Sequence, residues 1–216
     1  MVSKQYYFVP LFTILFLLDH KLIFPPTHQA HDDGLLCIGG DLSVERLLLA
    51  YQQGIFPWYN EGEPICWYTP DPRFVLFPDQ LYVSKSMEKI IRQNNFTWSL
   101  NQHTNEVIKR CRYQNRPGQD GTWLTDEMEA AYNRLHQAGY IISAECFMND
   151  HLVGGLYGVL MNQVFCGESM FSEQSNASKF AFIQLVRYLQ QQGIKLIDCQ
   201  VYTPHLESLG AEMISR

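Results

Sequence analysis

The sequence predicts an α+β fold, in which helices pack on a mixed sheet and a smaller N-terminal unit comes first. The chain has 216 residues, of which 46% are hydrophobic and 18% charged, so a sizeable core is expected. Residues 140–169 contain three predicted strands, separated by turns at 149–150 and 162–163. A predicted helix ending near residue 192 and a buried strand at 194–200 follow. A meander of strands beside a strand–helix–strand unit is typical of an α+β sheet.

The N-terminus contains an apolar run, residues 6–18, which is short for a membrane span and includes Pro10. No small-residue cleavage site follows this run. We therefore expect a buried strand or packed segment there, rather than a signal sequence or a membrane anchor. A helix is expected at 43–53, capped by Asp41 or Ser43.

Residues 54–73 combine four prolines with tryptophans and tyrosines and show little periodicity. A segment of this kind covers a core or forms the wall of a binding site. We place the boundary between the N-terminal unit, 1–62, and the main domain, 63–216, within it. The main domain is expected to begin with strands at 73–78 and 96–100 and helices at 84–93, 104–112 and 126–138.

Charge is distributed unevenly along the chain. The formal net charge is −6, which argues against non-specific binding of long nucleic acids over the whole surface. Residues 85–116, however, contain seven Lys or Arg against two Glu. We expect this segment to form one basic surface for a small, defined anionic partner, although an ordinary solvated surface would look similar.

The six cysteines are scattered, with no C-x-x-C pair and no histidine at metal-ligand spacing. Most lie in apolar runs, where cysteine acts as a small hydrophobic residue. This usage favours a reducing cytoplasm and no metal site.

Two motifs place polar groups at strand ends. In "LIDCQV" (196–201), strand alternation puts Asp198 and Gln200 on the same face. In "FCGESMF" (165–171), the same alternation puts Glu168 with Cys166 and Met170. If the two strands are neighbours, two carboxylates and an amide face one cleft. The alternatives are a buried Asp that satisfies a nearby loop and a Glu at an exposed strand end. No nucleophile elbow, phosphate-binding loop or HExxH motif occurs.

Long ordered blocks of the sequence resemble the leucyl/phenylalanyl-tRNA–protein transferase family. They cover most of residues 24–214, which makes the resemblance specific. The blocks are "FPP" (24–26), "GLLCIGGDLS" (34–43), "LLLAYQQGIFPWY" (47–59), "ICWYTPDPRFVLFP" (65–78), "GTWLTDEMEAAYNRLHQAGY" (121–140), "LVGGLYGV" (152–159), "FCGESMFS…NASK" (165–179) and "LIDCQV…HLESLGAEMI" (196–214).

This resemblance implies a small N-terminal domain followed by a GNAT-like acyltransferase domain. It implies transfer of Leu or Phe, and less well Met, from aminoacyl-tRNA to proteins that begin with Arg or Lys, which marks them for degradation. The enzyme would be a cytoplasmic monomer without cofactor or membrane partner. The acetyl-CoA pyrophosphate loop is replaced by "SEQSNASKFA" (172–181), which argues against a CoA-dependent acetyltransferase. A silent module that binds tRNA ends or protein N-termini is the other alternative, and the Asp198 and Gln200 pair disfavours it.

The resemblance also assigns roles to individual residues. The catalytic pair falls on Asp198 and Gln200, and the carboxylate for the acceptor falls on Glu168. The other roles are an aminoacyl pocket of Leu156, Phe165 and Met170, a tRNA 3′-adenosine wall of Trp58 and Trp123 with Tyr51 nearby, and phosphate contacts at Lys89 and Arg92.

The chain departs from the family pattern at four places. The basic run near Lys89 is diluted by Glu88 and Gln93, which implies a lower affinity for tRNA. Leu156 stands where Met is typical, which is a volume-conserving change. Thr203 stands where Asn is expected, and the sequence ends at Arg216, before the last helical segment typical of the family.

Overall fold

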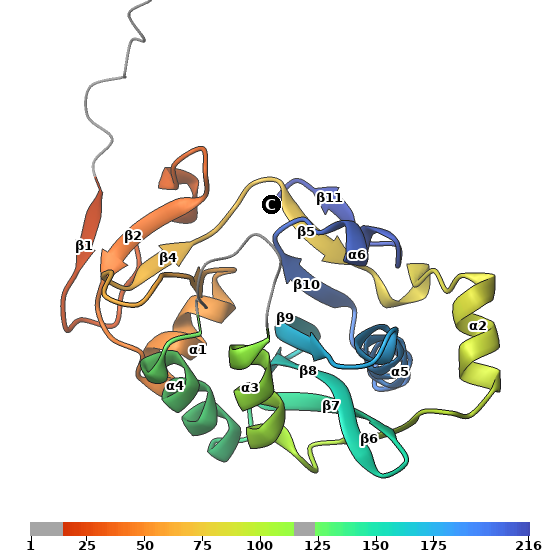
Figure 1. The fold of residues 1–216 in the computed structure, drawn as a ribbon. Helices are drawn as coiled ribbons and strands as arrows, with labels where there is room; N and C mark the ends of the chain where they lie inside the picture. The colour runs from red at the N-terminus through yellow and green to blue at the C-terminus, as the bar shows by residue number, and fades with distance from the viewer. Residues whose placement is uncertain (1–14, 115–123) are drawn as a thin grey trace, which may run out of the picture.

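The computed structural model describes residues 15–114 and 124–216 of the chain, which form two sheets with helices around them (Figure 1). The smaller sheet has the strand order β1-β2-β4-β3. Its strands are β1 (Phe16–Leu18), β2 (Leu35–Gly39), β3 (Phe56–Pro57) and β4 (Cys66–Tyr68), accompanied by helix α1 (Val44–Gln52) and the 3-10 turn η1 (Thr27–Gln29).

The larger sheet has seven strands in the order β11-β5-β10-β9-β8-β7-β6. Within its described strands, β9 and β10 are the only parallel neighbours, and helix α5 (Ala177–Gln191) connects them. The strands are β5 (Arg73–Leu76), β6 (Thr97–Leu100), β7 (Ile141–Met148), β8 (His151–Met161), β9 (Val164–Ser172), β10 (Leu196–Gln200) and β11 (Glu212–Ile214). The remaining elements are η2 (Pro78–Gln80), α2 (Lys85–Arg92), α3 (Thr104–Tyr113), α4 (Asp126–Gln137) and α6 (Pro204–Glu207).

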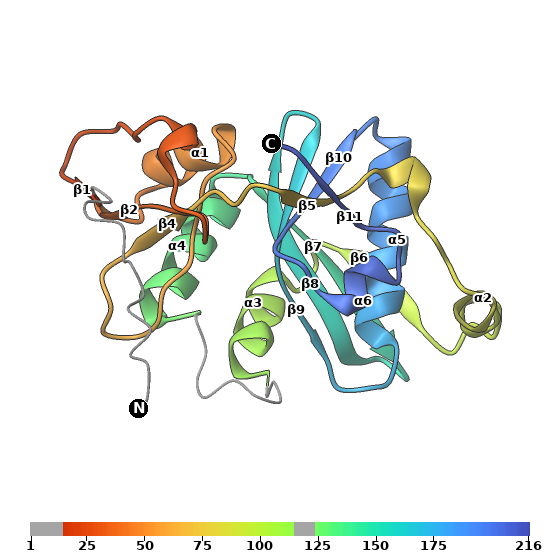
Figure 2. The same ribbon diagram turned by 90° about the horizontal axis from the view of Figure 1, so that it is seen from above.

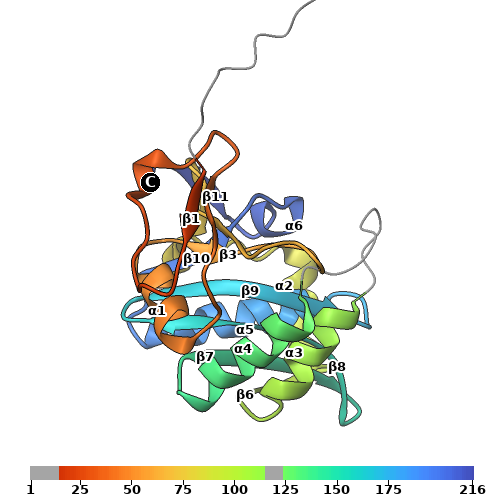
Figure 3. The same ribbon diagram turned by 90° about the vertical axis from the view of Figure 1, so that its left-hand side faces the viewer.

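Helices cover both faces of the larger sheet (Figure 2). On one face, α5 packs against the sheet with apolar residues that include Phe180, Ile183 and Val186. On the other face, α3 and α4 pack together with α1 and the smaller sheet, around buried side chains such as Trp67 and Tyr132. Figure 3 shows this second layer from the side of the smaller sheet.

The local sequence signals account for most helix starts. Ser43, Ser84 and Thr125 each accept a hydrogen bond through their side-chain oxygen from a backbone N–H in the first turn, which satisfies one of the otherwise unpaired donors. The strands of the meander also lie where the sequence placed them, and Asn149 and Asp150 turn between β7 and β8 with positive φ.

The smaller sheet continues beyond residue 62. Strand β4 pairs with β2 and β3, and the chain then crosses to β5 of the larger sheet. We therefore propose that the two units meet at 69–72, rather than near residue 62. Parts of both units contribute to one hydrophobic cluster, so their cores are continuous.

The N-terminal apolar run is less buried than expected. Leu17 in β1 is 77% exposed, and Leu15 also lies at the surface. Phe16 and Leu18 of the same strand are half-buried and pack against the hydrophobic cluster. The expected packed strand is therefore present at the edge of the smaller sheet, with Leu17 exposed. Residues 6–14 lie outside the described residues. In the ranges 15–114 and 124–216, none of the helices has the length and apolar character needed to span a membrane.

The described part of the basic segment, 85–114, does not form one surface, and Arg116 lies outside the described residues. Helix α2 lies on the side of the sheet covered by α5, whereas α3 packs on the opposite face (Figure 2). In α3, Arg110 pairs with Glu106 and Glu173, and Arg112 pairs with acidic residues of α4. The single phosphate-binding surface predicted from composition is therefore wrong, since the fold divides the segment and neutralises part of its charge.

Candidate functional site

A cavity opens where strands β9 and β10 separate. The two strands pair over three residues, from Leu196 opposite Val164 to Asp198 opposite Cys166, and then diverge. The cavity has a volume of about 400 Å³ and is mostly apolar. Its walls are formed by Phe56, Pro57, Trp58, Leu156, Tyr157, Gly167, Glu168, Ser169, Met170, Phe182, Ile197, Cys199, Gln200, Val201, Thr203, His205 and Leu206.

A β-bulge in β9 places Glu168 at this cavity. Tyr157 of β8 is opposite Ser169 and Gly158 is opposite Gly167, so Glu168 is an extra residue with no partner on β8. Beyond the extra residue, each side chain of β9 lies on the face of the sheet opposite to the one that regular strand alternation would give. Cys166 therefore packs with the α3 side of the sheet and Met170 with the α5 side. The expectation that Glu168, Cys166 and Met170 share one face is wrong, because simple alternation does not survive a bulge.

The Glu168 carboxylate accepts three hydrogen bonds from neutral donors. Tyr51 in α1 donates to Oε1 at 2.8 Å, and Tyr132 in α4 donates to Oε2 at 2.5 Å. The side-chain amide of Gln200 donates to Oε1 at 2.9 Å. Three elements that are distant in sequence thus fix the position of one carboxylate.

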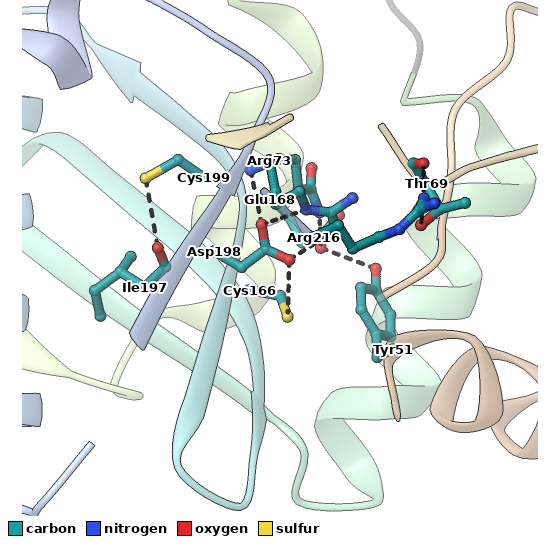
Figure 4. A network of polar contacts seen from close by, with 10 residues as sticks. Tyr51, Thr69, Arg73, Cys166, Glu168, Ile197, Asp198, Cys199 and Arg216 are labelled. Carbon is teal, nitrogen blue, oxygen red and sulfur yellow. Dashed lines mark hydrogen bonds and ion pairs between the residues drawn. The ribbon is translucent and has the colours of Figure 1, made fainter. Parts of the chain in front are cut away.

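Asp198 points away from the cavity, toward Arg73 at the start of β5 (Figure 4). The Arg73 guanidinium donates from Nε to Oδ1 at 2.8 Å and from Nη2 to Oδ2 at 2.7 Å, in a buried two-point ion pair. Asp198 Oδ1 also accepts the backbone N–H of Gln200 at 2.9 Å. The guanidinium in turn lies over the ring of Phe56, at 4.8 Å from its centroid.

The predicted common face of Asp198 and Gln200 is also wrong. The register of β10 against β5 shifts between these two residues, and Gln200 has a φ of 64°. This local irregularity turns the Gln200 side chain into the cavity, whereas Asp198 remains in the ion pair. The expectation that β9 and β10 are neighbours is confirmed.

Burial controls the titration of the groups around the cavity. It raises the pKa of Glu168 to about 7, against the lowering effect of the hydrogen bonds from Tyr132, Tyr51 and Gln200. Burial also raises the pKa of the Cys199 thiol, so this cavity-lining cysteine is a poor nucleophile. The pKa of His205 is lowered by burial and by Lys179, so its ring lines the cavity in the neutral form at pH 7.

The cavity contains part of the predicted aminoacyl pocket. Leu156 and Met170 are cross-strand neighbours and both line it. Phe165 does not line it, which corrects the sequence-based expectation. The Phe165 ring is fully buried and fills the space beside Gly158, where an added Cβ would lie 2.5 Å from the ring.

The predicted adenosine wall is divided in the structure. Trp58 lines the cavity, is 41% exposed and packs against Tyr68 with ring centroids 5.6 Å apart. Trp123 lies outside the described residues. Tyr51 is buried and binds Glu168 instead of facing the cavity, so its expected place beside the adenosine is corrected.

Lys89 and Arg92 lie on α2, which contributes no residue to the cavity. Neither forms an ion pair within 15–114 and 124–216. Among these same residues, no group of three His, Cys, Asp or Glu side chains has the arrangement needed to hold a metal ion.

Two residues of the site were missed by sequence reasoning, Arg73 and Tyr132. A signal for Arg73 was present, since an arginine that opens the apolar run "FVLF" (74–77) requires a buried partner. Nothing in the sequence indicates that Tyr132, on the buried side of α4, would donate to a carboxylate on β9.

The chain matches the family model "Leucyl/phenylalanyl-tRNA protein transferase" over residues 75–216. It belongs to this family. The model for the N-terminal domain of the same family matches residues 40–71. The family members are aminoacyltransferases by name, and this chain is therefore an enzyme that transfers an aminoacyl group from tRNA to protein.

Curated relatives match nearly the whole chain. The leucyl/phenylalanyl-tRNA–protein transferase of Christiangramia forsetii is 53% identical over 94% of this chain and 96% of its own length. The transferase of the same name from Flavobacterium johnsoniae is 54% identical over 94% of this chain and 95% of its own length. The resemblance stated from sequence motifs is confirmed.

Among solved structures, FemX is similar with a TM-score of 0.50 at 9% identity, over 80% of this chain and 67% of that chain. A GCN5-related N-acetyltransferase from Kribbella flavida has a TM-score of 0.40 at 11% identity, over 78% of this chain and 60% of that chain. The similarity to FemX concerns the fold alone. The predicted α+β fold class, a mixed sheet with helices packed on it, is confirmed.

The ion pair of Arg73 and Asp198 gives a prediction for stability. Changing Arg73→Met leaves the buried Asp198 carboxylate without a positive charge beside it, which is expected to cost about 3–5 kcal/mol of unfolding free energy. The matched control is Arg187→Met, which breaks a half-exposed ion pair with Glu88 and should cost less than about 1 kcal/mol. Urea denaturation measures both changes. Equal small losses in the two variants would show that the buried pair is not a structural requirement.

The pKa of Glu168 gives a second prediction. Its pKa is about 7 in the folded protein, against 4.5 for an ordinary glutamate. The folded state therefore binds the Glu168 proton more tightly than the unfolded state does. The contribution of this proton to the free energy of unfolding is complete below pH 4.5 and is lost as the pH rises through 7. Between pH 4.5 and 8, the free energy of unfolding of the wild type should fall by about 3 kcal/mol relative to that of Glu168→Gln. Urea unfolding across this range measures the difference, and parallel stability curves would contradict it.

Proposed function

We propose that this enzyme transfers Leu or Phe, and less well Met, to proteins that begin with Arg or Lys, and so marks them for degradation. The observation that carries the proposal is the cavity at the divergence of β9 and β10. It combines apolar walls with a single ionisable carboxylate, Glu168, at the position where Gln200 also points inward.

The apolar part of the cavity suits an aliphatic or aromatic donor side chain. Leu156 and Met170 face each other across β8 and β9, and Phe182 of α5 closes the same wall. A charged donor side chain would lose its hydration there without gaining a partner. Leu156 and Met170 therefore select the transferred residue, and Trp58 at the cavity stacks on the 3′ adenosine of the tRNA. Trp123 is proposed to share that role.

Glu168 and Gln200 serve the acceptor. Glu168 provides the one negative charge expected of a site for an N-terminal Arg or Lys, together with the apolar surroundings that strengthen the attraction. The Gln200 amide nitrogen is already bonded to Glu168, which leaves its carbonyl oxygen to accept a hydrogen bond from the α-amine. Asp198 holds the backbone of Gln200, and Arg73 holds Asp198.

The chemistry requires positioning more than activation. The aminoacyl ester is already reactive, and an α-amine with a pKa of about 7.7–8.0 is partly neutral at pH 7. Holding both reactants in one cavity contributes several kcal/mol by proximity and orientation. The proposed reaction uses no metal, ATP or coenzyme A. We further propose a cytoplasmic monomer, and the free thiols of all six cysteines are consistent with a reducing compartment.

The first test is aminoacyl transfer itself. Purified protein is incubated with labelled Leu-, Phe-, Met-, Val- or Asp-tRNA and a peptide that begins with Arg. Transfer is expected from Leu-, Phe- and Met-tRNA. Val-tRNA should react slowly, since one methylene in an apolar pocket is worth about 1–3 kcal/mol. Asp-tRNA should give almost no transfer, because its charged side chain would lose its hydration in the pocket. The same peptide beginning with Asp is the acceptor control. Binding of tRNA without transfer would favour a silent binding module, and equal use of Leu- and Asp-tRNA would refute the donor pocket.

Lys89 and Arg92 give a separate test of tRNA binding. We propose that they contact tRNA phosphates, because α2 presents them without ion-pair partners in the described residues. Changing both residues to Ala should weaken the binding of all aminoacyl-tRNAs equally. It should also reduce the slope of log K against log salt concentration by about 1–2. Transfer from an aminoacyl-adenosine donor, which has no distant phosphates, should be unchanged. A loss with this small donor would place α2 in the folding core or the active site instead.

A further inference from the structure

Glu168 and the two tyrosines form a closed triangle of polar contacts. Tyr51 lies 2.8 Å from the carboxylate, Tyr132 lies 2.5 Å from it, and the two phenol oxygens are 3.0 Å apart. Each corner comes from a different element, α1, α4 or β9. Both phenols are buried, whereas Glu168 lines the cavity.

The number of protons in this triangle depends on Glu168. Burial, and next the charge of Glu168, raise the pKa of both phenols, so each tyrosine keeps its single proton. When Glu168 is ionised, both phenol protons are donated to the carboxylate, and the contact between the two phenol oxygens has no proton. When Glu168 is protonated, three protons fill three contacts as a ring from Glu168 to Tyr132, to Tyr51 and back to Glu168. The same atoms therefore accommodate both protonation states without moving.

We propose that Glu168 is the general base of the reaction, which takes a proton from the α-ammonium group of the acceptor, and that Tyr51 and Tyr132 are the positioning residues for this step. The proposal rests on the proposed function and assigns a second role to the same carboxylate. It changes the role of Glu168 from a binding charge alone to the group that generates the nucleophile.

The proton balance of the reaction closes with this assignment. The ammonium loses one proton to Glu168, and the neutral amine forms a bond to the ester carbonyl carbon. As the bond from that carbon to the ribose oxygen breaks, the second proton of the new C–N centre moves to the ribose oxygen. The products are an amide and a ribose hydroxyl, and Glu168 then releases its proton to water.

The other polar groups of the site are less suited to this role. Asp198 is held in a two-point ion pair with Arg73 and does not line the cavity. Gln200 faces the cavity, but an amide oxygen is a very weak base. Glu168 combines access to the cavity with three hydrogen-bond donors that are neutral, so none of these partners carries a positive charge that would oppose its protonation.

The surroundings of Glu168 also favour uptake of a proton near neutral pH. Burial raises its pKa to about 7, close to that of an α-amine, which is the match that efficient proton transfer requires. Asp198 acts in the same direction. The titratable and charged groups around Glu168 are Tyr51 of α1, Arg73 of β5, Tyr132 of α4, Tyr157 of β8, Cys166 of β9, Asp198 and Cys199 of β10, and His205 of α6 across the cavity.

The first experiment compares wild type with Glu168→Gln over pH 5.5–9, with saturating Leu-tRNA and varied Arg-starting peptide. We expect kcat to fall about 100-fold or more at pH 7 in the variant. The remaining rate should rise with pH up to the pKa of the free amine, about 7.7–8.0. A rise in the peptide KM with unchanged kcat would overturn the proposal, because Glu168 would then be a binding charge alone.

The second experiment uses Tyr51→Phe, Tyr132→Phe and the matched control Tyr188→Phe, a tyrosine of α5 outside the cavity. Each of the first two removes a donor that stabilises the ionised carboxylate, so the acid limb of the kcat profile should move up by about one pH unit. The control profile should match that of wild type. Lower kcat in Tyr51→Phe and Tyr132→Phe with an unmoved acid limb would contradict the positioning role.

A direct titration separates this proposal from the proposed function. The carboxyl carbon of Glu168 is followed by NMR in protein labelled with ¹³C-glutamate, and its signal is assigned by its absence in Glu168→Gln. A midpoint near 7 that rises in Tyr132→Phe supports the triangle, and a midpoint below 5 refutes it. These results are independent of any transfer. Absence of transfer from every donor in wild type, in contrast, refutes the proposed function.

Discussion

The short pairing of β9 with β10 is the constraint on which the site depends. The strands are held together over three residues and then separate, and each carries an irregularity at the point of separation. In β9 the extra residue is Glu168, and in β10 the shift lies between Asp198 and Gln200. These two defects open the cavity, turn Glu168 toward the tyrosines and send the Gln200 side chain across the gap to meet it.

The negative charges of the two carboxylates of the site, Asp198 and Glu168, are balanced by different kinds of partner. Asp198 is matched by the positive charge of Arg73, in a buried pair that also holds the backbone of Gln200. Glu168 is matched only by neutral donors, and burial raises its pKa to about 7. A charge balanced by a fixed cation serves as a structural anchor, whereas one balanced by hydroxyl and amide groups can exchange a proton.

The basic residues at the surface also differ in whether they have acidic partners. Within the basic segment, the arginines of α3 are joined to acidic residues of α4 and to Glu173, which follows β9, and so contribute to packing between layers. Lys89 and Arg92 of α2 have no such partners among the described residues and lie on the other side of the sheet. The unpaired basic charge of the described part of this segment is therefore smaller and more local than the composition indicated.

The sequence by itself determined the family, the fold class, the order of the main strands and helices, and the residue types of the site. These follow from local signals: caps such as Ser43, turn residues such as Asn149, alternation, and long family motifs. It did not determine which way Asp198, Glu168 and Phe165 point, the distant donors Arg73 and Tyr132, or the division of the basic segment. Only the tertiary structure decided these, because one bulge residue reverses the facing of all that follow and because buried charges choose partners from elements far apart in the chain.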